Sequence, residues 1–184
     1  TKRFIRCFWA LDKNLANARH YPSISWLDSY SEYTEEIFDY WNNIDSDIVD
    51  VRNEAMAILK REERLSQIVK LIGPDALPDN QRIILLVADM IKKGFLQQNA
   101  YDEIDMYSTP KKQAELLKLI MEFYHNAVKV IDLGAPIVKI RELGIADEIV
   151  KLKSQIPNNE PEKLNEYSYK IKEKFEELIK FYKS

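Results

Sequence analysis

The sequence predicts an all-α fold: a helical bundle with one short strand near its N-terminus. Three observations lead to this prediction. Apolar residues recur every three or four positions through most of the chain, and capping and breaking residues separate these periodic segments. In addition, only 4 of the 184 residues are glycine. A period near 3.6 is typical of amphipathic helices, whereas folds rich in strands and turns use more glycine.

The N-terminal part is expected to hold the strand, one short helix and one longer helix. Residues 4–9 form a short apolar run that is consistent with a strand. Residues 11–19 favour a short helix that stops before Pro22, because the residue before a proline avoids helical geometry. Residues 28–42 are a helix candidate, since their aromatic and apolar side chains fall on one side of a helix.

Two long helices are expected next, as an antiparallel pair. Apolar positions between residues 51 and 72 step by threes and fours and are interrupted only by Glu62. The second helix opens near Pro78, a residue that suits the first helical position. A short turn at residues 73–77 joins the two helices, so they should lie side by side.

Three further helices are expected in the C-terminal half. The stretch Ser-Thr-Pro at residues 108–110 combines an N-cap with proline at the first helical position. This helix breaks at residues 134–136, and a weaker helix follows to about residue 155. Residues 157–161 form a linker, and the last helix carries its apolar stripe between residues 164 and 182.

Composition narrows the classes of function. The net charge of −3 and the pI near 5.6 argue against a protein that binds nucleic acid or a membrane surface. Cys7, the single cysteine, excludes an internal disulfide and indicates a reducing compartment. It stands in an apolar run without a partnered base, which favours a buried small side chain over a nucleophile. The first residue is Thr1 and not Met, which fits a processed chain or a piece of a larger one.

Few residues carry candidate chemistry. No phosphate loop of the form G-x-x-x-x-G-K-[ST] occurs, so nothing here can hold a triphosphate by itself. Glu122 and His125 match the Glu-x-x-His of di-iron bundles, but such sites need a second copy and two further glutamates. His20 supplies no second copy, so we expect no metal site. Tyr21 and Tyr101 lie in loops, where packing in a helical core does not explain them.

Three stretches resemble one family. They are Phe-Trp-Ala-Leu-Asp at residues 8–12, Arg-His-Tyr-Pro-Ser-Ile-Ser-Trp-Leu at residues 19–27, and Phe-Leu-Gln-Gln-Asn-Ala-Tyr at residues 95–101. Together they resemble the C-terminal part of the catalytic A subunit of archaeal and vacuolar-type rotary ATPases. The match runs in order over at least residues 4–107. The turn Gly-Pro-Asp-Ala-Leu-Pro at residues 73–78 favours the archaeal branch.

The resemblance implies how the chain is divided. Residues 1–27 would be the C-terminal edge of the nucleotide-binding domain, and residues 28–184 would be the C-terminal helical bundle. The phosphate loop, the catalytic glutamate and the magnesium ligands would lie upstream and outside this fragment. We therefore expect no catalytic residue and no metal ligand in the chain, and we expect the isolated fragment to be inactive.

The resemblance also implies a binding site for the adenine of ATP or ADP, while Mg²⁺ would be held by the missing upstream domain. In the family the adenine lies between two aromatic rings, which here would be Tyr21 and Tyr101. The amide-rich residues beside Tyr101 would contact the edge of the base, where a charged side chain would be costly to desolvate. The expected nucleotide-binding residues are Tyr21, Pro22, Gln98, Asn99, Ala100 and Tyr101. The alternative is that residues 96–102 are an ordinary polar loop between helices.

The implied partners are B subunits, in an alternating A3B3 hexamer, and the central stalk, contacted through the turn at residues 73–80. The whole complex would sit on the cytoplasmic face of a membrane and couple ATP synthesis or hydrolysis to the transport of H⁺ or Na⁺. Two other classes stay open at this point. One is an autonomous helical domain that binds a partner protein, and the other is a metal-binding bundle.

Overall fold

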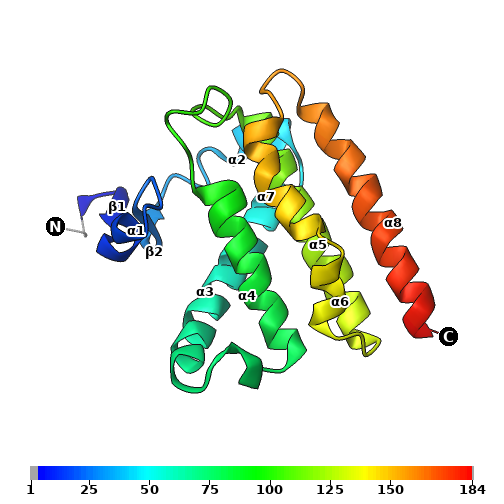
Figure 1. Ribbon diagram of the computed structural model, residues 1–184. Coiled ribbons are helices and arrows are strands. Elements are labelled where there is room, and N and C mark those ends of the chain that lie inside the picture. Colours follow the sequence, from blue (N-terminus) through cyan, green and yellow to red (C-terminus); the bar gives the residue numbers. More distant parts are fainter. Residues whose placement is uncertain (1–3, 184) are drawn as a thin grey trace.

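The computed structural model describes residues 4–183 and is mainly helical (Figure 1). The α-helices are α1 (Lys13–Asn17), α2 (Phe38–Ile44), α3 (Ile48–Ile72), α4 (Asp79–Ile91), α5 (Pro110–Asp132), α6 (Ile137–Glu142), α7 (Ile145–Gln155) and α8 (Leu164–Lys183). The strands are β1 (Cys7–Leu11) and β2 (Ile24–Ser31), and short 3₁₀ turns cover Pro74–Ala76 and Pro161–Lys163. The predicted all-α class, with a minor strand element at the N-terminus, is confirmed.

Strands β1 and β2 form an antiparallel hairpin at one side of the bundle (Figure 1). Phe8 pairs with Tyr30, and the next paired residues are Ala10 and Ser25. Residues 26–29 therefore bulge out of the ladder, and a bulge of this kind bends a strand and redirects its side chains. The expectation of a single strand at residues 4–9 is thus incomplete, because the structure contains a second strand that pairs with the first.

The bulge turns Trp26 and Leu27 towards the bundle, where both pack against the hydrophobic core. The helix expected at residues 28–42 is wrong in its first part, since β2 runs to Ser31 and α2 begins only at Phe38. Aromatic residues three or four positions apart also occur in a bulged strand followed by turns. Here the backbone of the strand finds its hydrogen-bond partners in β1, which a single-segment pattern does not reveal.

β1 begins at Cys7, three residues later than expected, and Phe4 before it is 90% exposed. The Cys7 side chain is half-buried rather than fully buried as expected. The hairpin covers it only partly, because two strands provide one shallow layer.

The core of the bundle lies between α3, α4, α5, α7 and α8 (Figure 1). α3 and α4 form the predicted antiparallel pair, and α5 packs against both. Their apolar stripes meet at fully buried side chains such as Ile58, Val87 and Phe123. α8 closes the other side of α5, where the rings of Phe123 and Phe175 meet edge to face at 5.4 Å between centroids.

The single weak helix expected between the break at 134–136 and residue 155 is two helices. α6 ends at Glu142 and α7 begins at Ile145. Gly144 lies between them with φ of 69°, a left-handed conformation that favours glycine. The turn lets α7 fold back against α4, with Ile149 fully buried.

α4 continues directly into a π-helix, Lys92–Leu96, so the first part of the loop expected from residue 94 is helical. Gly94 permits a close approach of this segment to α7. A Cβ atom at this position would lie only 3.1 Å from the Cα of Val150. The loop itself begins at Gln97, whose backbone is extended.

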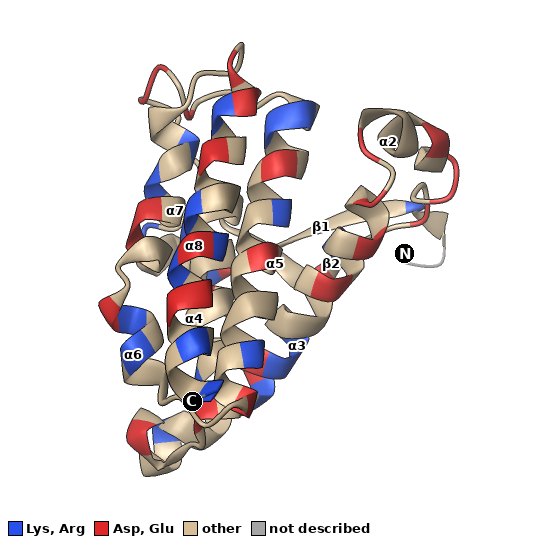
Figure 2. Ribbon diagram, turned by 90° about the vertical axis from the view of Figure 1, so that its right-hand side faces the viewer, with Lys and Arg blue, Asp and Glu red and all other residues tan. Residues whose placement is uncertain are grey.

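Acidic and basic side chains are interspersed on the exposed faces of the helices (Figure 2). Several form ion pairs between elements, including Lys118 with Asp45 at 2.6 Å and Lys92 with Glu62 at 2.6 Å. Within residues 4–183, none of the helices combines the length and the apolar character that crossing a lipid bilayer requires.

Candidate functional site

Two loops that are far apart in the sequence meet beside the hairpin: the loop after α1 and the loop after the π-helix. The backbone N–H of Gln98 donates to the carbonyl oxygen of Tyr21 at 2.7 Å. Nearby, Nε2 of Gln97 donates to the carbonyl oxygen of Arg19 at 3.4 Å. The structure thus joins the two segments that the sequence analysis assigned to one site.

Both aromatic rings of the candidate site are open to solvent. Tyr21 is 52% exposed and Tyr101 is 98% exposed. The remaining expected residues share partial or full exposure: Pro22, Gln98, Asn99 and Ala100. A flat ligand therefore has access to both rings, and stacking requires an open ring face.

Short side chains shape the loop at residues 97–105 by local hydrogen bonds. Oδ1 of Asn99 accepts from the backbone N–H of Tyr101 at 3.0 Å. Oδ1 of Asp102 accepts from the backbone N–H groups of Ile104 and Asp105 at 2.9 and 2.8 Å. Turns of this kind explain part of the amide content of the loop. Asn99 therefore holds the backbone of Tyr101 in addition to any contact with a ligand.

Two residues that no sequence pattern singled out, Asp105 and Lys153, support the loop from below. Asp105 is 5% exposed, and its Oδ2 accepts from the backbone N–H of Asn99 at 2.8 Å. The same oxygen lies 3.1 Å from Nζ of Lys153 in α7. Nζ of Lys153 also donates to the carbonyl oxygen of Gln97. One cation and one carboxylate therefore hold both ends of the segment Gln97–Asn99.

Lys112 of α5 lies under this pair and is fully buried. Its Nζ donates to the carbonyl oxygen of Lys153 at 2.7 Å. Burial lowers the pKa of Lys112, while Asp105 and Asp102 act against this shift. A signal for it was present in the sequence, because Lys112 falls on the apolar stripe of α5 one turn before Leu116.

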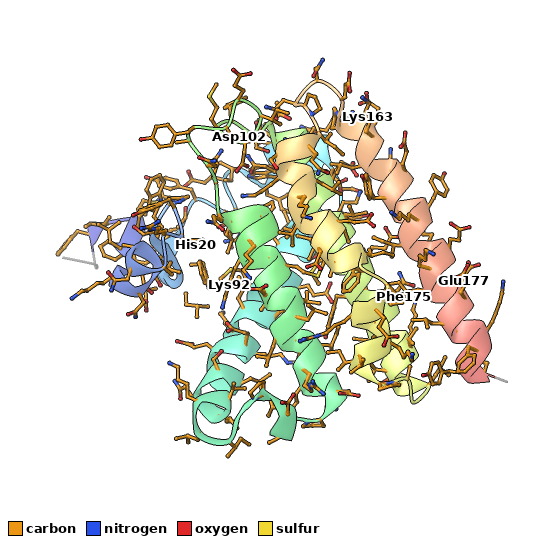
Figure 3. The ribbon with its side chains drawn as sticks, in the orientation of Figure 1. His20, Lys92, Asp102, Lys163, Phe175 and Glu177 are labelled. Atoms are coloured by element: carbon orange, nitrogen blue, oxygen red, sulfur yellow. The ribbon has the colours of Figure 1, made fainter. Side chains whose placement is uncertain are left out.

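His20 precedes Tyr21 and is 8% exposed. Its ring meets the ring of Trp26 edge to face at 5.5 Å, and its Nε2 has no hydrogen-bond partner among residues 4–183. Figure 3 places His20 on the hairpin, next to the end of α4 that leads to Lys92. Burial lowers the pKa of His20, and the positive charges of Lys153 and Lys92 lower it further. Both effects favour the neutral form of the imidazole.

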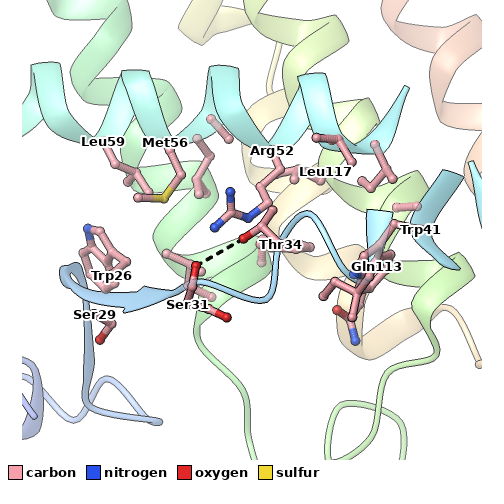
Figure 4. Close-up of a pocket in the computed structure, with 18 of the residues that line it drawn as sticks. Trp26, Ser29, Ser31, Thr34, Trp41, Arg52, Met56, Leu59, Gln113 and Leu117 are labelled. Carbon is pink, nitrogen blue, oxygen red and sulfur yellow. Dashed lines mark hydrogen bonds between the residues drawn. The ribbon is translucent and has the colours of Figure 1, made fainter. Parts of the chain in front are cut away.

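A mainly apolar cavity lies elsewhere, between β2 with the following turn and helices α3 and α5 (Figure 4). It measures about 450 Å³, and its walls are mainly apolar, with Trp26, Trp41 and Met56 among them. None of the six expected nucleotide-binding residues lines it. A smaller cleft of about 380 Å³ lies beside the loop, between Asp102, Asp105 and α7. Because a backbone hydrogen bond joins the two loops and each loop carries an exposed tyrosine, we place the candidate site there.

The turn between α3 and α4 lies at the opposite end of α4 from these loops (Figure 1). Gly73 turns the chain with φ of 83°, and a 3₁₀ turn follows. Arg82 braces the turn through Asp75 at 3.2 Å and Asp79 at 3.3 Å. Leu77 is buried, which makes the end of the turn part of the core.

Glu122 and His125 make separate contacts with two other helices. Nε2 of His125 lies 2.8 Å from Oε1 of Glu54 in α3, and Glu122 pairs with Lys172 of α8 at 3.3 Å. The described residues contain no group of three His, Cys, Asp or Glu side chains arranged to hold a metal ion. Both side chains therefore connect helices of the bundle.

Comparison with known proteins identifies one family. Residues 39–141 match the family described as the C-terminal domain of V and A type ATP synthase. The match covers α2 to α6 and includes the loop with Tyr101 and the turn at residues 73–80. The hairpin lies before this range, and α7 and α8 lie after it.

Individual relatives match almost the whole chain. The V-type ATP synthase alpha chain of Halothermothrix orenii is 48% identical over 183 residues, which are 99% of this chain and 31% of the relative. The A subunit of the A-type ATP synthase of Methanopyrus kandleri is 49% identical over 97% of this chain and 30% of the relative. Its counterpart in Thermococcus sibiricus is 44% identical over 99% of this chain and 31% of the relative.

The chain therefore spans about a third of the length of these relatives. A-type and V-type chains, the latter including one from Clostridium tetani at 48% identity, match it about equally well. Because bacterial relatives stand beside archaeal ones, the archaeal origin favoured by the turn at residues 73–78 stays a prediction.

Proposed function

This chain belongs to the family of C-terminal domains of V- and A-type ATP synthases, and from that premise we propose that it forms the adenine-side helical domain of a catalytic subunit. The subunit would synthesise or hydrolyse ATP in a rotary complex that transports H⁺ or Na⁺. The relatives named above are A subunits of A-type enzymes and V-type alpha chains, and this supports the proposal.

One observation carries the assignment of the adenine site: the hydrogen bond between the backbones of Gln98 and Tyr21. It joins a loop that precedes the bundle to a loop within it, and each loop supplies one open aromatic ring. Stacking of a base on such a ring stabilises binding by on the order of 1–3 kcal/mol. Tyr21 and Tyr101 would contact the faces of the adenine, and Pro22, Gln98, Asn99 and Ala100 would line its edge.

The described residues fit a base better than they fit phosphates. The loops present ring faces and amide groups, and the nearby cation of Lys153 is already paired with Asp105, which leaves the exposed Arg19 without a phosphate loop around it. We therefore assign the binding of the phosphates and of Mg²⁺ to the part of the subunit outside this chain. The phosphoanhydride bond of ATP that reacts would also lie there. The fragment by itself is expected to show no ATP hydrolysis.

The same domain would pass motion to the rest of the complex. In an alternating hexamer with B subunits on the cytoplasmic face of the membrane, closure on nucleotide would move the bundle as one body. The turn at residues 73–80 lies at the far end of α4 and would contact the central stalk. Its bracing by Arg82 supports a stiff contact.

The adenine assignment is tested in the full-length subunit by substituting the two rings. Tyr101→Ala and Tyr21→Ala should each weaken ATP binding by roughly 1–3 kcal/mol, because a stacking face is lost. Tyr101→Phe and Tyr21→Phe are the matched controls and should bind nearly as the wild type, because the face is kept. Binding is measured by isothermal titration with ATP.

Tripolyphosphate, which lacks the base, should bind all of these variants alike. The proposal fails if both alanine variants bind ATP as tightly as the wild type, because the base would then lie elsewhere.

A further inference from the structure

The support beneath the loop at residues 97–105 is built differently from an ordinary surface ion pair. The side chain of Lys153 is 15% exposed and that of Asp105 is 7% exposed, so water screens their 3.1 Å contact only weakly. Each partner also bonds to the backbone of the loop: Lys153 to the carbonyl of Gln97 and Asp105 to the N–H of Asn99. These contacts bracket Gln98, the residue whose N–H reaches Tyr21.

The helix that carries Lys153 is a rigid base. Ile149 and Leu152 of α7 are fully buried. Val150 touches the π-helix at Gly94, and the buried Lys112 binds the carbonyl oxygen of Lys153 itself. The side chain of Lys153 therefore anchors the loop to the core, while Tyr101, at the outer end of the loop, is exposed to solvent.

We propose that Lys153 and Asp105 form a latch, called here the α7 latch, that positions Gln98 and Tyr101 for recognition of the nucleotide base. The inference rests on the proposed function and adds two positioning residues to it. Neither residue touches the ligand in this account. The latch fixes the backbone from which the ligand contacts extend, so its loss should affect the base and leave the phosphates unaffected.

A merely structural ion pair would behave differently. Its loss would lower the stability of the domain and would change the affinity for ATP and for tripolyphosphate to the same extent. The ratio of the two affinities therefore separates positioning from stability, since tripolyphosphate lacks the base.

The experiment uses the full-length subunit with Lys153→Met, which keeps the length of the side chain and removes its charge. The affinity for ATP should fall about ten-fold, a fraction of what two stacked rings contribute. The affinity for tripolyphosphate should not change. Lys151→Met is the matched control, because Lys151 is exposed on the same helix, and it should leave both affinities unchanged.

A second variant keeps the inference testable if Lys153→Met does not fold. Asp105→Ala frees the N–H of Asn99 and should also weaken ATP binding selectively. In the double variant Lys153→Met with Asp105→Ala, the loss should be smaller than the product of the two single losses, because one latch is removed twice. Hydrogen exchange should quicken in the peptide covering residues 97–107 and stay unchanged in α8.

Three results would overturn the inference. The first is an equal change for ATP and tripolyphosphate, and the second is unchanged ATP affinity in both single variants. If Tyr101→Ala weakens ATP binding in that second case, the latch is rejected and the adenine site stands. The third result is that Tyr21→Ala and Tyr101→Ala also leave the affinity for ATP unchanged. In that case both the adenine site and the latch are rejected.

Discussion

Glu62 breaks the apolar stripe of α3, and its contacts give the reason. Its Oε2 pairs with Nζ of Lys92 at 2.6 Å, and Ser66 donates to its other oxygen. Nζ of Lys92 also lies 5.6 Å from the centroid of the Trp26 ring. A charged residue at a semi-buried position is tolerated when it is paired. Glu62 thus links α3, the π-helix and the hairpin beside the candidate site.

His20 is the residue whose protonation should alter the stability of this region. Its pKa in the folded state lies below the ordinary value of 6.5, because of burial first and then the charges of Lys153 and Lys92. Between the two pKa values the unfolded chain binds more protons, so stability rises with pH. The contribution is complete above about pH 6.5 and is lost as the pH falls towards the folded-state pKa.

We therefore expect the free energy of unfolding of the 184-residue chain to fall between pH 7.5 and pH 5.5, and His20→Gln to flatten this dependence. Urea denaturation at several pH values measures it. His125→Gln is the comparison: its side chain is 50% exposed and contacts Glu54, so its replacement should not flatten the fall. An unchanged slope in His20→Gln would show that other groups cause the dependence.

At the scale of the element, the long helices were predictable and their interruptions were not. α3, α5 and α8 each bury one face, so a period near 3.6 shows in the sequence. β2 depends on pairing with β1, a contact between segments that no local period reveals. The π-helix depends on the approach of Gly94 to α7, which also lies outside any single-segment pattern.

The antiparallel pair α3 and α4 has the second proposed role, which is contact with the central stalk. Leu71 is 86% exposed and Ile72 is 57% exposed near its end. Apolar residues this open at the end of a projecting helix favour contact with another protein. In contrast, Asp75 is exposed and already pairs with Arg82, so its charge should contribute under about 1 kcal/mol.

Leu71→Ser combined with Ile72→Ser should lower the torque of the assembled complex and leave ATP affinity nearly unchanged. Asp75→Asn is the control and should have little effect. Single-molecule rotation measures both variants. Full torque from the double variant would leave the turn a plain connection between helices. Deleting the turn is a poorer test, because Leu77 belongs to the core.

At the scale of the whole molecule, the candidate site and the projecting turn lie at opposite ends of one continuous helical segment, α4 with its π-helix (Figure 1). At about 1.5 Å per residue, a segment from residue 79 to residue 96 spans roughly 27 Å. A small rotation at the loop end therefore becomes a larger displacement at the turn. This geometry supports a bundle that links nucleotide binding to motion.

Residue patterns in the sequence assigned two loops to one site, and a backbone hydrogen bond joins these loops in the structure, but the patterns did not reveal what supports them. Tyr21 and Tyr101 stood out because they lie in loops and within family-like stretches. Asp105 and Lys153 did not, since a charged residue in a loop or on a helix is ordinarily solvated. Only the fold shows that they are buried against each other and against the backbone of the loop.

The central claim is that the adenine of ATP lies between the loops at residues 19–22 and 97–101. The most direct measurement is photolabelling of the full-length subunit with 2-azido-ATP, whose reactive group is on the base, followed by peptide mapping. We expect label on the peptides that contain Tyr21 or Tyr101, and we expect unmodified ATP to compete it away. ATP-protected label only on peptides outside these two loops would contradict the account.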